Sequence, residues 1–524
     1  MVLVRFPHDM LIRYSGLDER QLLEIPWKLG GESKMEGDSI IMEFNPDRPD
    51  LYSIQGVTRA MRLFTGAEEP SEDDIRGTDH KIMSSPPESR PYFLAAIVKG
   101  VNAGLLLEQI IDFQEKLHTT IGRNRKFSAI GLHDLSKVVF PLTYGEVARD
   151  HRFRPLGGDS EITLSEFMGN HPKAKEYGEL VGERIPAITD ANGEIISLPP
   201  ILNSSITEIG KETRDIFVDV TGTNYSVVYK TLMLMITSLS YGDGKMYSVL
   251  LNGAPSPSTK RRYISIPTRG LKKVLGYDTG IETIGNSLTK MGYLIAGEKV
   301  LVPLYRFDIL HDVDVVEDII KGIGFENVRM SKEEFVNYGK QNALRHLEEK
   351  TRGLLLGYGM NEVVNAVLTN GTFNKMYGFK DEAVKIQNPL SLEQDHVRTR
   401  IAPSLMHTLL TNFRNQYPQR IYEIGTVHRD GKEIDSLGIA VSHREASFSE
   451  IKGLMIGLLE DLDITNYKID KYELPMFVKG RLASVIVDDI IRGFFGEVDP
   501  QLLKNIGLKM PVALAELDIS EVVS

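Results

Sequence analysis

The length of the chain is the feature that most constrains its fold, because 524 residues cannot pack around one hydrophobic core. We therefore expect about three to five domains. The hydrophobic share of 42% and the charged share of 25% are typical of an ordinary soluble globular protein. No apolar run approaches the ~20 residues that a membrane-spanning helix needs, so we expect no membrane partner.

Cysteine is absent from the sequence. This absence excludes disulfides, zinc held by cysteine, iron–sulfur clusters and a thiol nucleophile. The first eight residues do not follow the plan of a signal peptide. The sequence therefore predicts a cytoplasmic protein.

The net charge of −11 argues against non-specific binding of nucleic acid by the whole surface. Three short basic segments stand out, at residues 123–126, 260–262 and 272–273. Each of them alone is explained as a solvated surface. An RNA partner would have to use such segments or be held mainly by another subunit.

Residues 1–85 have the pattern of a small α/β domain. Apolar residues recur at helical spacing from Leu51 to Phe64, with Asp50 as the expected N-cap and Gly66 at the C-terminal end. Proline, serine and acidic residues then dominate as far as residue 91. This composition predicts an exposed linker.

Residues 92–267 alternate strand-like and helical segments and form the second expected domain. One strand ends in the sequence DVTGTN, and its alternation places Asp219 and Thr221 on the same face. A carboxylate beside a hydroxyl at a strand end can position a water molecule or a sugar hydroxyl. Thr, Gly and Asn are also ordinary strand terminators, so the pattern alone favours turn chemistry over a functional site.

Two further domains complete the expected α+β multidomain chain. Residues 268–338 contain two short helices, a β pair and an acidic helix, which suggests a winged-helix-like module. Residues 339–524 contain the helix Pro403–Phe413, the strand Arg420–His428 and a hairpin that turns at residues 488–489. We expect an antiparallel sheet with helices there.

The acidic helix begins near Asp312 and has two distinct faces. At about 100° per residue, Asp314, Glu317 and Asp318 fall on one face. The opposite face is apolar and would pack on the core. Acidic residues in the first turn of a helix are common, because they complement its dipole.

A metal site is the alternative explanation for these acids. Asp308 precedes Asp314 by six residues, and no Lys or Arg occurs between Arg306 and Lys321. Four carboxylates that face one point repel one another, and a hard divalent cation relieves that repulsion. Oxygen ligands alone suit Mg²⁺ or Ca²⁺ rather than zinc.

Four motifs resemble one family in the same order along nearly the whole chain. They are NPDRPDLYSIQGVTRAM, SLPPILNSSITEIGKETRDIFVDVTGTNYS, YRFDILHDVDVVEDIIKGIGFENV and NPLSLEQDHVRTRIAPSLMHTLLTNFRNQYPQRIYEIG. Together they resemble the phenylalanyl-tRNA synthetase β subunit of the archaeal and eukaryotic type. The second motif resembles that family's editing domain, which would occupy residues 92–267. The last resembles its class II synthetase-like module.

The resemblance implies two sets of functional residues. Asp219 and Thr221 would belong to the editing site, where this chain has Asn224 in place of a usual Asp. The magnesium-associated positions of the family match this chain one by one, although the last is more often Glu. They are Asp308, Asp314, Glu317 and Asp318.

The class II-like module lacks the residues of a working ATP site. Arg420 and Glu423 fit an Arg-x-x-Glu pattern only superficially, and no Gly-x-Gly-x-Gly-x-x-Arg segment follows. The resemblance therefore implies that ATP binds on a separate α subunit, in an α2β2 complex that charges tRNA(Phe) with phenylalanine. This chain would supply assembly, a structural Mg²⁺ site and hydrolysis of mischarged Tyr-tRNA(Phe).

Two other functions compete with this interpretation. A free-standing editing hydrolase would act on mischarged tRNA without α, but it leaves the synthetase-like module unexplained. A non-enzymatic scaffold that binds nucleic acid through the winged-helix-like module would need a basic face there, and the acidic helix gives that module an acidic one.

Overall fold

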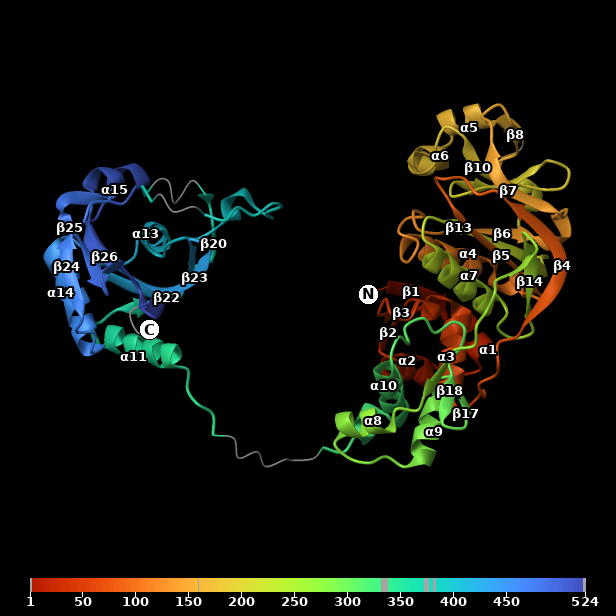
Figure 1. The fold of residues 1–524 in the computed structure, drawn as a ribbon, viewed down its shortest axis with the longest axis horizontal. Helices are drawn as coiled ribbons and strands as arrows, with labels where there is room; N and C mark the ends of the chain where they lie inside the picture. Colours follow the sequence, from red (N-terminus) through yellow and green to blue (C-terminus); the bar gives the residue numbers. More distant parts are fainter. Residues whose placement is uncertain (1, 159, 331–337, 372–376, 380–382, 522–524) are drawn as a thin grey trace. The chain divides into compact units, whose positions relative to one another are not determined.

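The chain divides into two compact units, Met1–Glu333 and Glu334–Ser524 (Figure 1). The structure is a computed structural model of the full sequence. It describes residues 2–158, 160–330, 338–371, 377–379 and 383–521.

The first unit begins with a small sheet and three helices. The strands are antiparallel in the order β1-β3-β2, and the core side of β3 carries Ile40, Met42 and Phe44. The elements are β1 (Val2–Pro7), α1 (His8–Ser15), α2 (Glu19–Lys28), β2 (Gly31–Glu36), β3 (Ser39–Phe44) and α3 (Ile54–Thr65).

The start of α3 differs from the expectation. Asp50 lies in a 3₁₀ turn, η1 (Pro49–Tyr52), and is not the N-cap. Ser53 caps α3 instead, because its Oγ accepts a hydrogen bond of 3.0 Å from the backbone N–H of Gly56. Gly66 ends the helix in the left-handed conformation, as expected.

A ten-stranded mixed sheet forms the centre of the first unit. Its path is β12-β11-β10-β7-β4-β14-β5-β13-β6, and β15 pairs with β14. The strands are β4 (Ile75–Ser84), β5 (Tyr92–Lys99), β6 (Ala129–Asp134), β7 (Leu142–Val147), β10 (Ile185–Thr189), β11 (Ile195–Leu198), β12 (Leu202–Asn203), β13 (Asp215–Gly222), β14 (Lys245–Leu251) and β15 (Ala254–Ser256).

The expected linker from residue 65 to 91 is wrong where it covers β4. This strand pairs in parallel with both β14 and β7, so it belongs to the central sheet. Only Ile82 of the strand is buried, and the other positions are mostly polar, with Met83 exposed to solvent. The strand therefore lacks the alternating apolar pattern that identifies a strand from sequence.

Helices cover one face of the central sheet. The apolar sides of α4 (Ala103–Thr119) and α7 (Tyr225–Leu239) join a large core with β5, β6 and β13. A smaller core around Tyr144 and Phe217 lies on the other face. A third core joins β8 (Arg152–Phe153), β9 (Ile162–Thr163), α5 (Leu164–Asn170) and α6 (Pro172–Tyr177) to nearby sheet residues.

The winged-helix-like module has the expected order of elements. Two helices are followed by a β pair and the acidic helix, and an extra strand precedes them. These elements are β16 (Tyr263–Ser265), α8 (Thr268–Leu275), α9 (Ile281–Lys290), β17 (Leu294–Ala296), β18 (Lys299–Leu301) and α10 (Asp312–Ile323). Its buried apolar residues belong to the same large core as those of the N-terminal sheet.

The second unit is a seven-stranded sheet with helices on both faces. The order is β19-β22-β23-β27-β26-β25-β24, antiparallel except for the short pair β19 and β22. The strands are β19 (Asn361–Glu362), β22 (Gln419–Arg429), β23 (Lys432–Ser442), β24 (Tyr467–Lys471), β25 (Phe477–Val487), β26 (Ile490–Val498) and β27 (Val512–Asp518).

Two separate cores lie on the two faces of this second sheet. Helices α11 (Ala343–Gly357) and α14 (Phe448–Asp461) pack in one core, and α13 (Ala402–Thr411) and α15 (Pro500–Ile506) pack in the other. The α+β multidomain class expected from the sequence is confirmed. No helix within the described residues is long and apolar enough to cross a membrane.

Candidate functional site

Asp219 and Thr221 lie side by side on β13, as their spacing predicts. Their side chains face the same side of the central sheet and are buried, with 1% and 0% of each residue exposed. Strand β13 is held between β5 and the edge strand β6, which fixes its position. The two residues nevertheless have different surroundings.

Asp219 faces a histidine on the neighbouring strand. Its Oδ2 lies 2.9 Å from Nε2 of His133, and Nδ1 of His133 lies 2.7 Å from Oγ1 of Thr207. Gly131 is the residue of β6 directly opposite Asp219. The absence of a side chain at Gly131 leaves room for the carboxylate.

Thr221 is bound to a buried arginine. Its Oγ1 accepts a hydrogen bond of 2.8 Å from Nε of Arg90, and its carbonyl accepts one of 2.8 Å from Nη2. The carbonyl of Arg90 in turn accepts a hydrogen bond from the hydroxyl of Tyr144. Burial lowers the pKa of Arg90 to about 10. Thr221 is therefore engaged by Arg90, and of these two residues only Asp219 lines open space.

That space is a cavity of about 430 Å³ along the outer edge of β6. Asp219 forms part of its wall, whereas Thr221 does not. The other walls come from α4, from the loop after it and from the segment Ser197–Asn203, whose Pro199–Pro200 peptide bond is cis. A cavity of this size is within the usual range for small-molecule sites.

An ion pair builds the cavity wall opposite β6. Nη2 of Arg125 lies 2.7 Å from Oε1 of Glu115, and Nη1 donates to the carbonyls of Pro200 and Ile201. Burial acts to raise the pKa of Glu115, but the hydrogen bond from His118 and the charges of His118 and Arg125 lower it to about 2.

Most of these cavity residues were not predicted from the sequence. The basic segment at 123–126 and the LPPILNS turn were both visible in the sequence, but nothing local joins them. Arg123, Asn124 and Arg125 all adopt positive φ angles, of 47°, 52° and 65°. Strained backbone of this kind is concentrated at functional sites.

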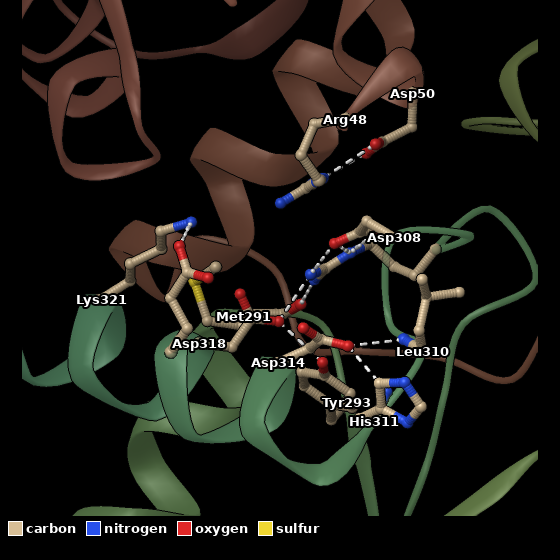
Figure 2. A network of polar contacts seen from close by, with 12 residues as sticks. Arg48, Asp50, Met291, Tyr293, Asp308, Leu310, His311, Asp314, Asp318 and Lys321 are labelled. Carbon is tan, nitrogen blue, oxygen red and sulfur yellow. Dashed lines mark hydrogen bonds and ion pairs between the residues drawn. The ribbon is translucent and has the colours of Figure 1, made fainter. Parts of the chain in front are cut away.

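The acidic residues expected to hold Mg²⁺ belong to a network of polar contacts, in which Figure 2 labels Asp308, Asp314 and Asp318. Nη2 of Arg306 lies 2.7 Å from Oδ2 of Asp308 and 2.6 Å from Oδ2 of Asp318. The hydroxyl of Tyr293 donates a further bond of 2.7 Å to Asp318. Although burial acts to raise the pKa of Asp308, the charge of Arg306 lowers it to about 2.

The other two acids of the set have partners of their own. Oδ2 of Asp314 accepts hydrogen bonds of 2.6 and 2.7 Å from the backbone N–H groups of Leu310 and His311. Glu317 forms a salt bridge of 2.7 Å with Lys321 on the same helix, and 61% of its side chain is exposed. The four carboxylates therefore do not face one point.

This arrangement does not fit a magnesium site. Arg306 supplies the positive charge between Asp308 and Asp318, and Arg48, paired with Asp50 at 2.8 Å, is buried nearby (Figure 2). Within the ranges that the structure describes, no group of three or more His, Cys, Asp or Glu side chains is placed to hold a metal ion. Magnesium binding at these residues remains a prediction from the sequence and the resemblance.

The second unit carries buried ion pairs where the superficial Arg-x-x-Glu pattern falls. Glu423 is buried and lies 2.5 Å from Nη1 of Arg398. Arg420 is on the same strand but contacts a different glutamate. Its Nη2 lies 3.4 Å from Oε1 of Glu450. The carboxylate of Glu516 accepts hydrogen bonds from the backbone N–H groups of Ile401 and Ala402, at the start of α13. The arginine and glutamate of the pattern are thus not partners.

Comparison with known proteins gives the family. Residues 90–237 match the B3/4 domain, residues 264–325 the tRNA synthetase B5 domain, and residues 332–519 the phenylalanyl tRNA synthetase beta chain CLM domain. The chain is 36% identical to the phenylalanine–tRNA ligase beta subunit of Methanococcus aeolicus, over 92% of this chain and 93% of that protein. The chain belongs to the phenylalanine–tRNA ligase β-subunit family.

Other members of the family agree with this assignment. The beta subunit of Archaeoglobus fulgidus is 34% identical over 99% of this chain and 98% of that protein. The crystal structure of an N-terminal fragment of the phenylalanyl-tRNA synthetase β subunit from Pyrococcus horikoshii matches with a TM-score of 0.58 and 28% identity. It covers 62% of this chain and all of that fragment. The family and fold expected from the four motifs are confirmed.

Proposed function

We propose that this chain is the β subunit of a phenylalanine–tRNA ligase and hydrolyses mischarged Tyr-tRNA(Phe) in the cavity beside β6. An α subunit would bind ATP and charge tRNA(Phe) with phenylalanine, in a cytoplasmic α2β2 complex. Family membership over nearly the whole length of the relatives supports the subunit role. The buried carboxylate of Asp219 in the cavity wall carries the editing proposal.

The need for a second site follows from the two substrates. Tyrosine exceeds phenylalanine by one hydroxyl, and an apolar pocket rejects such an addition by only about 100-fold. A second cavity with polar walls can bind the extra hydroxyl and so select the wrong product. The Glu115 and Arg125 pair, together with Gln114 and Asn203, gives this cavity polar groups of that kind.

Asp219 would orient water and substrate. Hydrolysis breaks the ester bond between the tyrosine carbonyl carbon and the 3′-terminal ribose oxygen. Water supplies the new oxygen of the carboxyl group, and the ribose oxygen takes up a proton. A carboxylate fixed at the cavity wall can accept a hydrogen bond from the attacking water and align it with the carbonyl.

In this proposal, the site that charges tRNA(Phe) with phenylalanine lies on the α subunit. A nucleotide needs arginines free to meet its phosphates, and in the described part of the second unit Arg398 and Arg429 pair with Glu423 and Asp518. These two buried arginines are thus already engaged by carboxylates. The role of the second unit would be subunit assembly.

Deacylation kinetics test the editing proposal directly. The purified α/β complex is mixed with preformed Tyr-tRNA(Phe), and release of tyrosine is followed. We expect Asp219→Ala to slow release by about 100-fold or more, because the carboxylate that orients the attacking water is lost. Asp215→Ala, on the same strand but outside the cavity, is the matched control and keeps the rate.

The same assay separates the competing functions. A free-standing hydrolase predicts that the chain without α deacylates as fast as the complex. A scaffold predicts no deacylation in either sample. Rapid release by an Asp219→Ala complex would refute the site proposed here.

A further inference from the structure

We infer that His133 is the positioning residue of the proposed editing reaction, holding Asp219 in its working orientation through a hydrogen-bonded chain that begins at Thr207. This inference rests on the proposed function, since it assigns a role only if Asp219 acts on the substrate. It adds a residue that touches neither the cavity nor the reacting atoms.

The hydrogen-bonded chain links three separate elements of secondary structure. Thr207 ends the 3₁₀ turn η4 (Ser205–Thr207), His133 is on β6, and Asp219 is on β13. All three side chains are buried, with Thr207 and His133 fully enclosed. The distances of 2.7 Å and 2.9 Å are those of well-formed hydrogen bonds.

The chemistry of the partners fixes the direction of the two bonds. A carboxylate oxygen can only accept, so Nε2 of His133 carries the proton and donates it to Asp219. Nδ1 is then an acceptor, and the hydroxyl of Thr207 donates to it. Such an arrangement locks the imidazole ring in one tautomer and one orientation.

His133 determines which oxygen of Asp219 is available to the cavity. Among the described residues, hydrogen bonds to the Asp219 carboxylate engage Oδ2 alone. Arg90 is near enough to interact with this carboxylate electrostatically, but its guanidinium hydrogen bonds go to Thr221. Oδ1 is therefore left for a group inside the cavity.

The neighbouring backbone leaves the carboxylate little freedom to turn. A Cβ built at Gly131 would lie 1.9 Å from Oδ2 of Asp219 and 2.8 Å from Nε2 of His133. The carboxylate thus fills the space above Gly131 and is bounded on one side by His133. Loss of the imidazole would open that side and let Asp219 rotate away from the cavity.

The hydrogen-bonded chain also connects the carboxylate to the segment Ser197–Asn203, which lines the cavity. Thr207 follows closely after Leu202 and Asn203, which belong to that segment, and Nδ2 of Asn203 donates to the carbonyl of Leu132 at 3.3 Å. The hydrogen bonds of His133 and Asn203 therefore join β6 to the segment that runs from Leu202 to Thr207. A displacement of about 1 Å at a catalytic group can slow a reaction by about 100-fold.

The test compares two substitutions of His133 in the α/β complex. His133→Leu removes both hydrogen bonds, whereas His133→Gln keeps an amide that can donate to Asp219. Deacylation of Tyr-tRNA(Phe) is measured under single turnover at a series of enzyme concentrations, with phenylalanine charging as the assembly control. His151→Leu, an exposed histidine, is the matched substitution.

We expect His133→Leu to lower the maximal deacylation rate by about 100-fold with a change of less than about threefold in the half-saturating concentration. His133→Gln should lose less than about tenfold, because the donor to Asp219 is retained. A residue that serves only packing would not distinguish glutamine from leucine in this way.

Asp219→Ala in the same experiment separates the two proposals. If Asp219→Ala is inactive and His133→Leu is as fast as the unsubstituted complex, the role of His133 is overturned and the editing site stands. Equal loss in both His133 variants also overturns it. If Asp219→Ala retains its rate, both proposals fall.

Thr207→Val covers the case in which His133→Leu does not assemble. This substitution keeps the shape of the side chain and removes only the donor to Nδ1. We expect a loss of about tenfold in the maximal rate, because the ring is less firmly oriented. An unchanged rate would overturn the hydrogen-bonded chain.

Discussion

At the scale of single residues, the partner of each polar group decides its role. Asp219 and Thr221 are equivalent in the sequence, yet one lines a cavity and the other is bound to Arg90. Spacing along a strand gives the face on which a residue lies, and this was predicted correctly. It does not give the residues that come from other strands, and so His133 could not be found.

The same limit explains the acidic cluster. The interval between Arg306 and Lys321 has no Lys or Arg, which predicted acids without a nearby positive charge. The two basic residues that bound this interval are the partners. Arg306 reaches Asp308 and Asp318, and Lys321 reaches Glu317.

Replacement of Arg306 tests its role at the centre of the acidic cluster. Arg306→Met leaves Asp308 and Asp318 buried without their cation, which costs ~3–5 kcal/mol for a buried pair. We expect the unfolding temperature of the first unit to fall by about 5 °C or more in calorimetry of the full chain. Lys321→Met on the same helix is the control, since its partner Glu317 is largely exposed and contributes little. Equal shifts in the two variants would contradict the central role of Arg306.

At the scale of elements, strong local patterns were predicted and weak ones were not. The acidic helix α10 begins at Asp312, where its apolar face and capping acids place it. The hairpin between β25 and β26 turns at Asp488 and Asp489, both with positive φ. Strand β4 was missed because long-range parallel pairing, rather than an apolar pattern, makes it a strand.

The effect of Mg²⁺ on the unfolding temperature tests the structure at the start of α10. The geometry predicts that Mg²⁺ does not stabilise this helix, because its carboxylates already have partners. We expect the unfolding temperature of the full chain to stay within about 1 °C between excess EDTA and millimolar Mg²⁺. A rise with Mg²⁺ that disappears in Asp314→Asn would contradict this and support the ligand set implied by the resemblance.

At the scale of the whole molecule, domains inferred from sequence need not be separate cores. The four expected domains cover residues 1–85, 92–267, 268–338 and 339–524, whereas the chain forms two compact units. One core runs from the N-terminal sheet through the central sheet to α10. Changes in composition along a chain mark where elements change, but packing between distant segments decides which elements share a core.

The central claim is that this chain works as the β subunit of a ligase complex, and purification from native cell extract tests it most directly. A tag is placed on the chain, co-purifying proteins are identified by mass spectrometry, and the eluate is assayed for phenylalanine-dependent charging of tRNA. We predict one equimolar partner together with charging activity. A chain recovered alone and without charging activity would contradict the claim.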